Sequence, residues 1–342
     1  MTTTTRSGAA RRGLAKHLTE PLVVGDPDLS GPLAVYPLLG PTASQRFVAL
    51  SQADGEVTIG EVASASVRDL AVTNTGKIPV LLYEGQEVLG GQQNRSVDSA
   101  ILVPPGVEKS VPVSCVEAGR WDHHSHRARF VGSPHSPSPR LRRSKSDRVR
   151  ASLAAGDAGY ADQGEVWSLV DSISAQLHTS SRTRSLSDAY EARDAELREV
   201  TDSIELHDGQ LGVLVTIGGE FCVLDFVGRP DVFAALHDPL LRGYALEALA
   251  SPDAAKAESS IDDARRSVDA VMGASGDERP SRGLGTDVRF TRQGISGSAL
   301  VNDGELVQLT AFPVAGRGTR RTETPPASIR RPSRRPSRRR AE

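Results

Sequence analysis

Charged, amide and glycine residues are concentrated in residues 84–95 of this 342-residue chain, the stretch EGQEVLGGQQNR. Its two carboxylates, Glu84 and Glu87, stand three residues apart. On a straight strand they would face opposite sides, because side chains alternate. A bulge or turn at Gly85 would let both carboxylates converge on one ligand. Glu84 is therefore a candidate catalytic residue and Gly85 a candidate ligand-binding residue.

The second half of this stretch supplies hydrogen-bonding groups. Gly90-Gly91 permits a close backbone approach, and Gln93, Asn94 and Arg95 follow as donors and acceptors. Arg95 carries a planar guanidinium that can bind a phosphate in a bidentate manner. Together these residues suit a polyhydroxyl or phosphate ligand. The alternative is a solvated hairpin corner with a glycine-rich bulge, because glycines in strands usually mark bends.

The stretch SCVEAGRW, residues 114–121, contains the second set of candidates. Cys115 would be a thiolate nucleophile if Arg120 lowered its pKa. A single cysteine that ends an apolar strand is more often a buried small hydrophobe, and we expect burial here. Glu117 is the other candidate catalytic residue, as a general base for water. Glu117 and Arg120 form either a structural or a ligand-facing ion pair.

Neither the histidines nor the basic run predicts a definite site. Four histidines cluster in this region, but zinc sites need regular ligand spacing and usually Cys or carboxylate partners. The histidines have neither the regular spacing nor such partners, so no metal site is predicted. The basic run at 140–148 would bind nucleic acid non-specifically, clamp phosphates of a small ligand or act as a solvated linker. Few aromatic residues interleave with this run, which weakens the case for base stacking. The histidines concerned are His123, His124, His126 and His135.

Known catalytic signatures give no support for an enzyme. The chain lacks GxGxxG, a P-loop, G-x-S-x-G and HExxH. The glycines near residues 283–297 are too dispersed to hold a dinucleotide. No cofactor is therefore predicted.

The formal net charge of −2 is small because two basic segments offset an acidic remainder of the chain. Residues 120–150 have a balance of +7 and residues 317–342 a balance of +8, which leaves −17 for the other residues. The body is therefore acidic. The Arg-rich tail, which repeats R-R-P-S, is expected to make at most weak electrostatic contacts with nucleic acid or with the acidic body.

Composition favours a globular protein of the reducing interior. Hydrophobic residues make up 38% and charged residues 25%, which is typical of soluble domains. No run approaches eighteen apolar residues, so no membrane contact is expected, and the N-terminus lacks the apolar core of a signal peptide. The two cysteines, Cys115 and Cys222, make a disulfide framework unexpected. We expect a cytoplasmic location.

Periodicity predicts an α+β chain with an N-terminal antiparallel β-sandwich-like module. Short apolar or alternating runs separated by turn residues indicate its strands, at 67–74, 77–84, 99–103 and 110–117. An α/β half with helices packed on a small antiparallel sheet is expected to follow. The division predicted is a disordered tail (1–18), the β-rich module (19–118), a basic Pro/Ser/His/Arg loop (119–150), the α+β half (151–313) and a disordered Arg-rich tail (314–342).

The second half alternates helical and strand-like patterns. An apolar face over 161–177 predicts a helix, and Ser187 is expected to cap a second helix at 188–203. Residues 210–226 predict a hairpin around Gly218-Gly219. Helices are then expected at 230–236, 239–249 and 254–272, and three short strands in 287–312.

Four segments in order resemble one known family. They are EGQEVLGGQQNR, VPVSCVEAGRW, the SLSDAYEA helix start after ADQGEVW, and GLGTDVRF…GSALVNDGELVQLTAF. The combination resembles the ARPP domain family, a domain of unknown function named for its association with ADP-ribosylglycohydrolases and rhodanese-like phosphatases. The resemblance covers about residues 30–313. It implies involvement in the metabolism of NAD-derived nucleotides, ADP-ribose or ADP-ribosylated targets, by association and not by chemistry.

Carried over residue by residue, the family motifs define a signature set in this chain. The set consists of Glu84, Gly85, Gln93, Asn94, Arg95, Ser114, Cys115, Glu117, Gly119, Arg120, Trp121, Gln163, Gly164 and Trp167. Two departures are Gly91-Gln92, where an Ala-Lys pair is expected, and Gln308, where relatives carry His. If that His were chemically important, catalysis in this chain would be in doubt.

The resemblance favours a site over a hairpin corner. If both motifs face one cleft, Arg95 and Arg120 suit a pyrophosphate, and Asn94 and the carboxylates suit ribose hydroxyls. Gly85, Gln93 and Trp121 complete the candidate ligand-binding set. Three hypotheses stay open: a binding module for a phosphorylated nucleotide or ADP-ribose-type ligand, a hydrolase of such a ligand, and a scaffold protein whose polar motifs are structural.

Overall fold

The computed structural model describes residues 13–53, 55–62, 67–120, 129–251, 254 and 260–314. Of the predicted N-terminal tail, residues 1–12 lie outside this part of the chain. Residues 13–18 lie inside it and are ordered, so the prediction was wrong there: Gly13–His17 form the 3-10 helix η1, which buries Leu14. The predicted C-terminal tail lies outside the described residues from position 315 onward.

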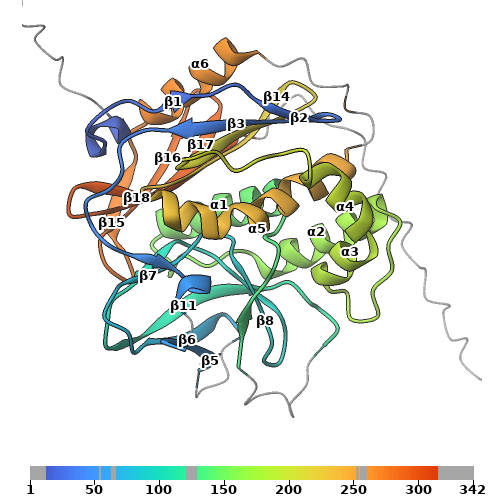
Figure 1. The fold of residues 1–342 in the computed structure, drawn as a ribbon. Coiled ribbons are helices and arrows are strands. Elements are labelled where there is room, and N and C mark those ends of the chain that lie inside the picture. Colours follow the sequence, from blue (N-terminus) through green and yellow to red (C-terminus); the bar gives the residue numbers. More distant parts are fainter. Residues whose placement is uncertain are drawn as a thin grey trace, which may run out of the picture.

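A large antiparallel sheet forms one layer of the molecule (Figure 1). Its strands are β1 (Val23–Val24), β2 (Asp28–Ser30), β3 (Leu33–Leu39), β13 (Gly212–Ile217), β14 (Glu220–Val227), β15 (Asp277–Pro280), β16 (Thr286–Arg292), β17 (Ile295–Asn302) and β18 (Glu305–Pro313). In the described part of the chain the order is β1-β3-β13-β14-β18-β17-β16-β15, and β2 also pairs with β3. The sheet therefore combines the N-terminal residues with the second half of the chain.

The β-rich module forms a second, smaller layer of two sheets. One has the order β10-β7-β4 and the other β12-β8-β9-β11-β6-β5. The strands are β4 (Val48–Ala49), β5 (Val57–Glu61), β6 (Asp69–Asn74), β7 (Val80–Leu82), β8 (Glu87–Leu89), β9 (Arg95–Val97), β10 (Ile101–Val103), β11 (Val107–Cys115) and β12 (Val131–Gly132). The 3-10 helix η2 (Leu50–Gln52) follows β4.

Helices fill the space between the two β layers (Figure 1). Helices α1 and α5 lie between the large sheet and the module, α2, α3 and α4 pack at one side, and α6 covers the outer face of the large sheet. The helices are α1 (Pro139–Ala154), α2 (Gln163–Gln176), α3 (Leu186–Ala192), α4 (Asp194–Thr201), α5 (Pro230–Leu249) and α6 (Ile261–Met272). The α+β class predicted from the sequence is confirmed.

Apolar side chains cover both faces of the large sheet. One core joins this sheet to α5 and to the module, and a second joins its other face to α6 and η1. Strand β13 consequently has five buried residues in succession instead of an alternating pattern, as expected of strands buried on both faces. The sheet is thus larger than the small antiparallel sheet that the sequence predicted, because β1, β2 and β3 join it.

Several predicted elements are confirmed. The hairpin around Gly218-Gly219 joins β13 to β14, both glycines having positive φ. The three strands predicted in 287–312 are β16, β17 and β18. The helix predicted at 161–177 is α2, which Asp162 caps by accepting from the backbone N–H of Glu165.

Four predictions about local structure were wrong. The basic segment 119–150, predicted as a loop, contains most of α1. The helix predicted at 188–203 is broken into α3 and α4 at Arg193, whose guanidinium donates to the carbonyl of Leu177. The N-cap of α3 is Ser185, not Ser187. The two helices predicted around Pro239 are the single helix α5, because a buried apolar face runs through the proline.

Candidate functional site

Helix α1 carries buried cations between the two β layers. Pro139 suits its first turn, because that position needs no N–H donor. Its buried residues Leu141, Arg142, Lys145 and Val149 follow helical spacing, but two of them are charged. The helix therefore faces its neighbours with ionic groups where an apolar stripe is usual.

The Arg142 guanidinium forms a fully buried pair with Asp225 on β14. Its Nη1 and Nη2 donate to Oδ2 and Oδ1 at 2.8 and 2.7 Å. Tyr244 and Thr310 donate to the same carboxylate at 2.6 and 2.8 Å, and the Tyr83 hydroxyl donates to it as well. Burial alone would raise the pKa of Asp225, but Arg142 and the hydroxyls of Tyr244 and Tyr83 hold it below its ordinary value. Arg142 thus ties α1 to the large sheet.

Lys145, one turn further along α1, ties the helix to the β-rich module. Its ammonium donates to the carbonyls of Ser96 and Val97, both at 3.0 Å, and lies 3.1 Å from Asp98. Burial lowers the pKa of Lys145, and Asp98 opposes that effect. Ser114 of the signature donates to Asp98 at 2.7 Å.

Glu84 lies in a third buried ionic group and not in a cleft. Its Oε2 accepts from Ser298 at 2.7 Å and lies 3.2 Å from Arg289 Nη1. The Arg289 Nε–H is shared by both oxygens of Asp287, at 2.9 and 3.0 Å. The Oε1 atom of Glu84 is buried and has no hydrogen-bond partner among the described residues. Glu84 therefore links the module to strands β16 and β17.

Gly85 has a steric role in this arrangement. Its φ is +91°, and a Cβ atom there would come within 2.7–2.9 Å of the Arg142 side chain. Only glycine combines this backbone conformation with such a close approach. The bend expected at Gly85 is present, but the two carboxylates do not converge. Glu84 pairs with Arg289, whereas Glu87 pairs with His135.

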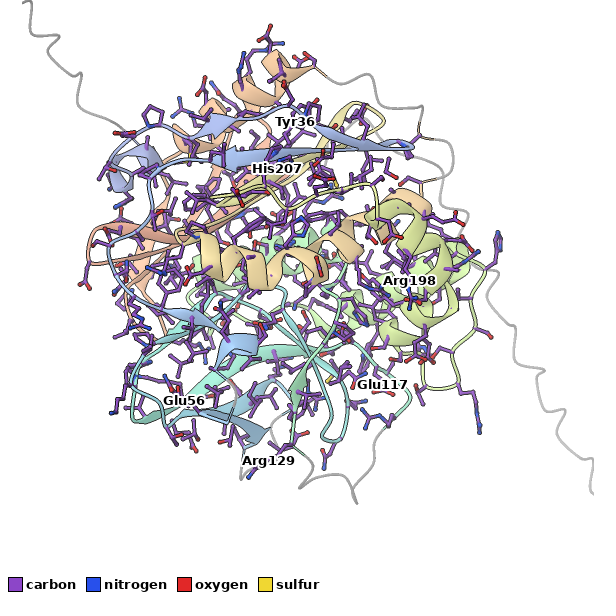
Figure 2. The ribbon with its side chains drawn as sticks, in the orientation of Figure 1. Tyr36, Glu56, Glu117, Arg129, Arg198 and His207 are labelled. Carbon is purple, nitrogen blue, oxygen red and sulfur yellow. The ribbon has the colours of Figure 1, made fainter. Side chains whose placement is uncertain are left out.

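Glu117 and Arg120 form an ion pair beside the glycine turn, at the edge of the module where Glu117 is labelled in Figure 2. Glu117 Oε2 lies 2.8 Å from both Nε and Nη2 of Arg120. Arg120 also donates to the carbonyl of Gly91 at 2.9 Å and to the side chain of Asn94 at 3.0 Å. Glu117 accepts from the backbone N–H of Asn94. Contacts within the protein thus occupy most donors of Arg120, which is 29% exposed.

Gln93 and Arg95 lie deeper in the same region. Gln93 donates to the carbonyl of Glu117 at 2.7 Å. The Arg95 side chain is completely buried, donates to the carbonyl of Gln93 at 2.8 Å and lies 3.7 Å from Glu61. In the part of the chain that the structure describes, its Nε and Nη2 have no hydrogen-bond partner. Gln93, Asn94, Arg95, Glu117 and Arg120 thus form one cluster, whereas Glu84 belongs to another.

Cys115 is buried, as expected. Burial raises its pKa to about 11, although Arg95 acts in the opposite direction. Gln163 of α2 accepts from the backbone N–H of Cys115 and donates to its carbonyl, both at 2.8 Å. The Q-G-x-V-W and S-C-V-E signature motifs therefore meet as a backbone clamp between α2 and β11.

The pair of Glu87 and His135 was not predicted from the sequence. Glu87 Oε2 lies 3.0 Å from His135 Nδ1, and the His135 ring stacks on Tyr190 with centroids 3.8 Å apart. Ser187, predicted as an N-cap, donates instead to Glu87. Because the sequence around His135 is rich in Ser and Pro, it was predicted to be a loop, and burial of the His135 side chain was not expected. Trp121 and the histidines at 123, 124 and 126 lie outside the described residues.

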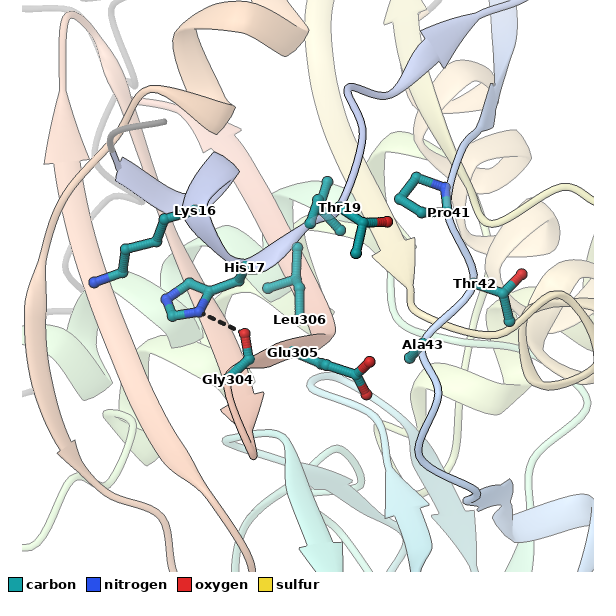
Figure 3. A pocket seen from close by; sticks show the side chains of 10 residues that line it. Lys16, His17, Thr19, Pro41, Thr42, Ala43, Gly304, Glu305 and Leu306 are labelled. Carbon is teal, nitrogen blue, oxygen red and sulfur yellow. Dashed lines mark hydrogen bonds between the residues drawn. The ribbon is translucent and has the colours of Figure 1, made fainter. Parts of the chain in front are cut away.

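Cavities formed by the described residues provide concave surface, and none of the following three is lined by any of the seven candidate site residues that the structure describes. One of about 120 Å³ lies beside His17, Thr42 and Glu305, where His17 Nδ1 is 3.0 Å from the carbonyl of Gly304 (Figure 3). A second, of about 320 Å³, opens at the N-terminus of α1. Its lining includes Arg140, Arg143, Phe221, Cys222, Glu247 and Ser251. The third, of about 140 Å³, lies at the C-terminus of α1 and includes Asp287.

The described residues contain neither a metal-binding cluster nor a membrane-spanning helix. No group of three or more His, Cys, Asp or Glu side chains is arranged there to hold a metal ion. No helix in that part of the chain combines the length and apolar character needed to cross a bilayer.

Comparison with protein families matches residues 21–312 to the ARG and Rhodanese-Phosphatase-superfamily-associated Protein domain, ARPP-1. The chain belongs to this family. The resemblance inferred from the four sequence segments is thereby confirmed. No curated protein and no solved structure matches the chain. In this ARPP-1 domain the described signature residues make contacts within the module and from it to α2 and the large sheet.

Proposed function

We propose that this chain binds a phosphorylated nucleotide or an ADP-ribose-type ligand in the cavity at Arg143. The family description, which refers to ARG and rhodanese-phosphatase proteins, is consistent with ADP-ribose metabolism. The cavity volume of about 320 Å³ falls within the range of small-molecule sites, roughly 300–1,000 Å³. The signature residues then support the fold around the site instead of contacting the ligand.

Arg143 is the observation that carries this proposal. It is half-buried, lines the cavity and makes no hydrogen bond or ion pair with any residue that the structure describes. Arg140 and Glu247 pair with each other across 3.7 Å, and Glu220 is exposed to solvent. A phosphate would therefore meet one guanidinium whose charge no protein group neutralises, which favours bidentate binding.

The other walls suit the remaining parts of a nucleotide. Phe221 offers an aromatic surface on which a base can pack. Glu247 and Ser251 offer oxygens to ribose hydroxyls, and both line the cavity. An arginine that donates to phosphate, an aromatic ring that packs on the base and a carboxylate that accepts from ribose hydroxyls together suit an ADP-ribose-type ligand.

A scaffold role is the second candidate, and the Arg95 and Arg120 contacts favour it. Both arginines bond to neighbouring signature residues, and Arg95 is completely buried. Arg95→Ala should lower stability by roughly 3–5 kcal/mol, because it leaves Glu61 buried without its cation. The hydrolase hypothesis has less support, since Glu84 and Glu117 are buried and do not line the Arg143 cavity.

Thermal-shift titration with ADP-ribose, NAD, AMP and inorganic phosphate tests the proposal. A ligand at a hundredfold excess over its Kd stabilises the native state by about 2.7 kcal/mol. We expect a nucleotide to raise the Tm of the wild type and of Arg148→Gln, whose parent residue lies on the exposed face of the same helix. Arg143→Gln should melt normally but lose the shift. An unchanged shift in Arg143→Gln would refute the assignment of the site.

A further inference from the structure

The cavity at the opposite end of α1 is built differently from the Arg143 cavity. It lies between Leu153 at the end of α1, the residues that lead into β10, and the segment that joins β15 to β16. Its volume of about 140 Å³ exceeds the roughly 10–15 Å³ that one water needs. Its polar lining consists of Arg279, Arg282, Asp287, Ser99 and Ser281.

Two arginines are fixed at this cavity by backbone carbonyls. Arg279 Nη1 donates to the carbonyl of Leu153 at 2.5 Å, and Arg282 Nη2 donates to that of Ala158 at 2.6 Å. Arg282 also stacks over the Tyr160 ring at 5.3 Å and lies 3.6 Å from Asp69. A guanidinium has five N–H donors, so these contacts leave donors for a ligand. Both cations are thus positioned before any ligand enters.

Asp287 supplies an acceptor in the same cavity. Its side chain is 17% exposed, and both of its oxygens accept from Arg289 Nε. Burial raises the pKa of Asp287; Arg289 and Arg279 oppose this, and Glu84 adds to it. A carboxylate of raised pKa is a strong acceptor for a ligand proton. It also repels any oxyanion that has no proton to donate.

We infer that this cavity binds a hydrogen-phosphate group, either inorganic phosphate or the phosphate of a small monoester. Arg279 and Arg282 donate to its ionised oxygens, and its P–OH donates to Asp287. Sulfate has the same shape but no proton at neutral pH, so it meets the Asp287 carboxylate as a like charge. The site is independent of the Arg143 cavity, because the two share no lining residue.

The test is calorimetric titration of the full chain at about pH 6, where a large share of a phosphate monoester still carries a P–OH because its second pKa is about 6. The ligands are phosphate, sulfate and ribose 5-phosphate at matched ionic strength. We expect phosphate to bind at least tenfold more tightly than sulfate. Ribose 5-phosphate binding more tightly than phosphate would identify a monoester as the ligand, and the reverse order would identify inorganic phosphate. Equal binding of phosphate and sulfate, or no binding of either phosphate probe, would overturn the inference.

Variants separate this site from the one at Arg143. Asp287→Asn should remove the preference for phosphate over sulfate, because an amide can donate to either anion. Arg279→Gln should weaken phosphate binding at least tenfold. Its control, Arg292→Gln, removes a similar contact, to the carbonyl of Gly273 beside α6, and should change nothing. Arg143→Gln should leave phosphate binding in the cavity at Arg279 intact. Loss of phosphate binding in Arg143→Gln would contradict the assignment of phosphate to the Arg279 cavity, and this test holds even if Asp287→Asn fails to fold.

Discussion

Arg142→Met should lower the free energy of unfolding by about 3–5 kcal/mol, because removing one partner of a buried ion pair leaves the other charge uncompensated. Asp225 would remain 0% exposed, with hydrogen bonds from Tyr83, Tyr244 and Thr310 but no cation. Methionine keeps an apolar stem of similar length, so lost packing contributes little. Calorimetry or urea denaturation would measure the change.

The expected fall in Tm follows from the size of the domain. About 290 residues at roughly 2.1 cal/mol/K each give an unfolding entropy of about 0.6 kcal/mol/K. A loss of 3–5 kcal/mol then corresponds to a fall of roughly 5–8 °C. Arg148→Met is the matched control: Arg148 lies on the same helix, is 55% exposed and pairs with Glu165, so its loss should cost under about 1 kcal/mol.

The Arg142→Met effect should depend on pH in a defined direction. The pKa of Asp225 is lowered in the folded protein, so its contribution to stability is complete above the unfolded value of about 3.9. That contribution is lost as pH falls through the folded pKa. In the variant, burial without Arg142 raises the pKa of Asp225, so protonation relieves the uncompensated charge at a higher pH than in the wild type. The stability difference should therefore be largest near neutral pH and shrink as the pH falls into the acid range.

A double variant distinguishes ionic from steric causes. Asp225→Asn in the Arg142→Met background removes the orphaned charge, so the two changes together should cost less than their sum. If Arg142→Met melts within 1 °C of Arg148→Met, or if the two costs simply add, the idea that this buried pair holds α1 against the large sheet is refuted.

Two other predictions concern signature residues. Gly85→Ala should destabilise the protein by roughly 2–4 kcal/mol, because a clash with Arg142 is added to backbone strain of roughly 1–2 kcal/mol. The control is Gly106→Ala, because Gly106 has a φ of +70° and open space around it. In the same thermal melts Gly106→Ala should show the cost of backbone strain alone. A thiol reagent at pH 7.5 should label Cys115 only after unfolding, because the thiol is buried with a pKa of about 11. Rapid labelling of native Cys115 would contradict its assignment as a structural residue.

Elements with ordinary local signals were predictable from the sequence. The turn at Gly218-Gly219, the strands β16 to β18 and the apolar face of α2 follow rules that act over a few residues. Helix α1 was not found, because the buried positions Arg142 and Lys145 are charged and their acidic partners lie far away in sequence. Ser138-Pro139 was the one local signal of a helix start there.

The candidate site was predicted only in part. Asn94, Arg95, Glu117 and Arg120 come together, which from the sequence was considered only as a condition for a shared cleft. The sequence could not show that these groups bond mainly to one another, because that depends on the packing of the module against α2 and α3. The sequence did not distinguish Arg143 from the other basic residues of its run. Only the fold shows that Arg142 is buried and paired with Asp225, whereas Arg143 lines a cavity.

Titration calorimetry of ADP-ribose with Arg143→Gln and Arg120→Gln, side by side, tests the central claim most directly. If the Arg143 cavity is the binding site and the signature residues are structural, Arg143→Gln should weaken binding at least tenfold without changing the Tm. Arg120→Gln should lower the Tm while the protein that remains folded binds as the wild type does. Full affinity in Arg143→Gln, together with lost affinity in a normally melting Arg120→Gln, would contradict the account and return the site to the Glu117–Arg120 cluster.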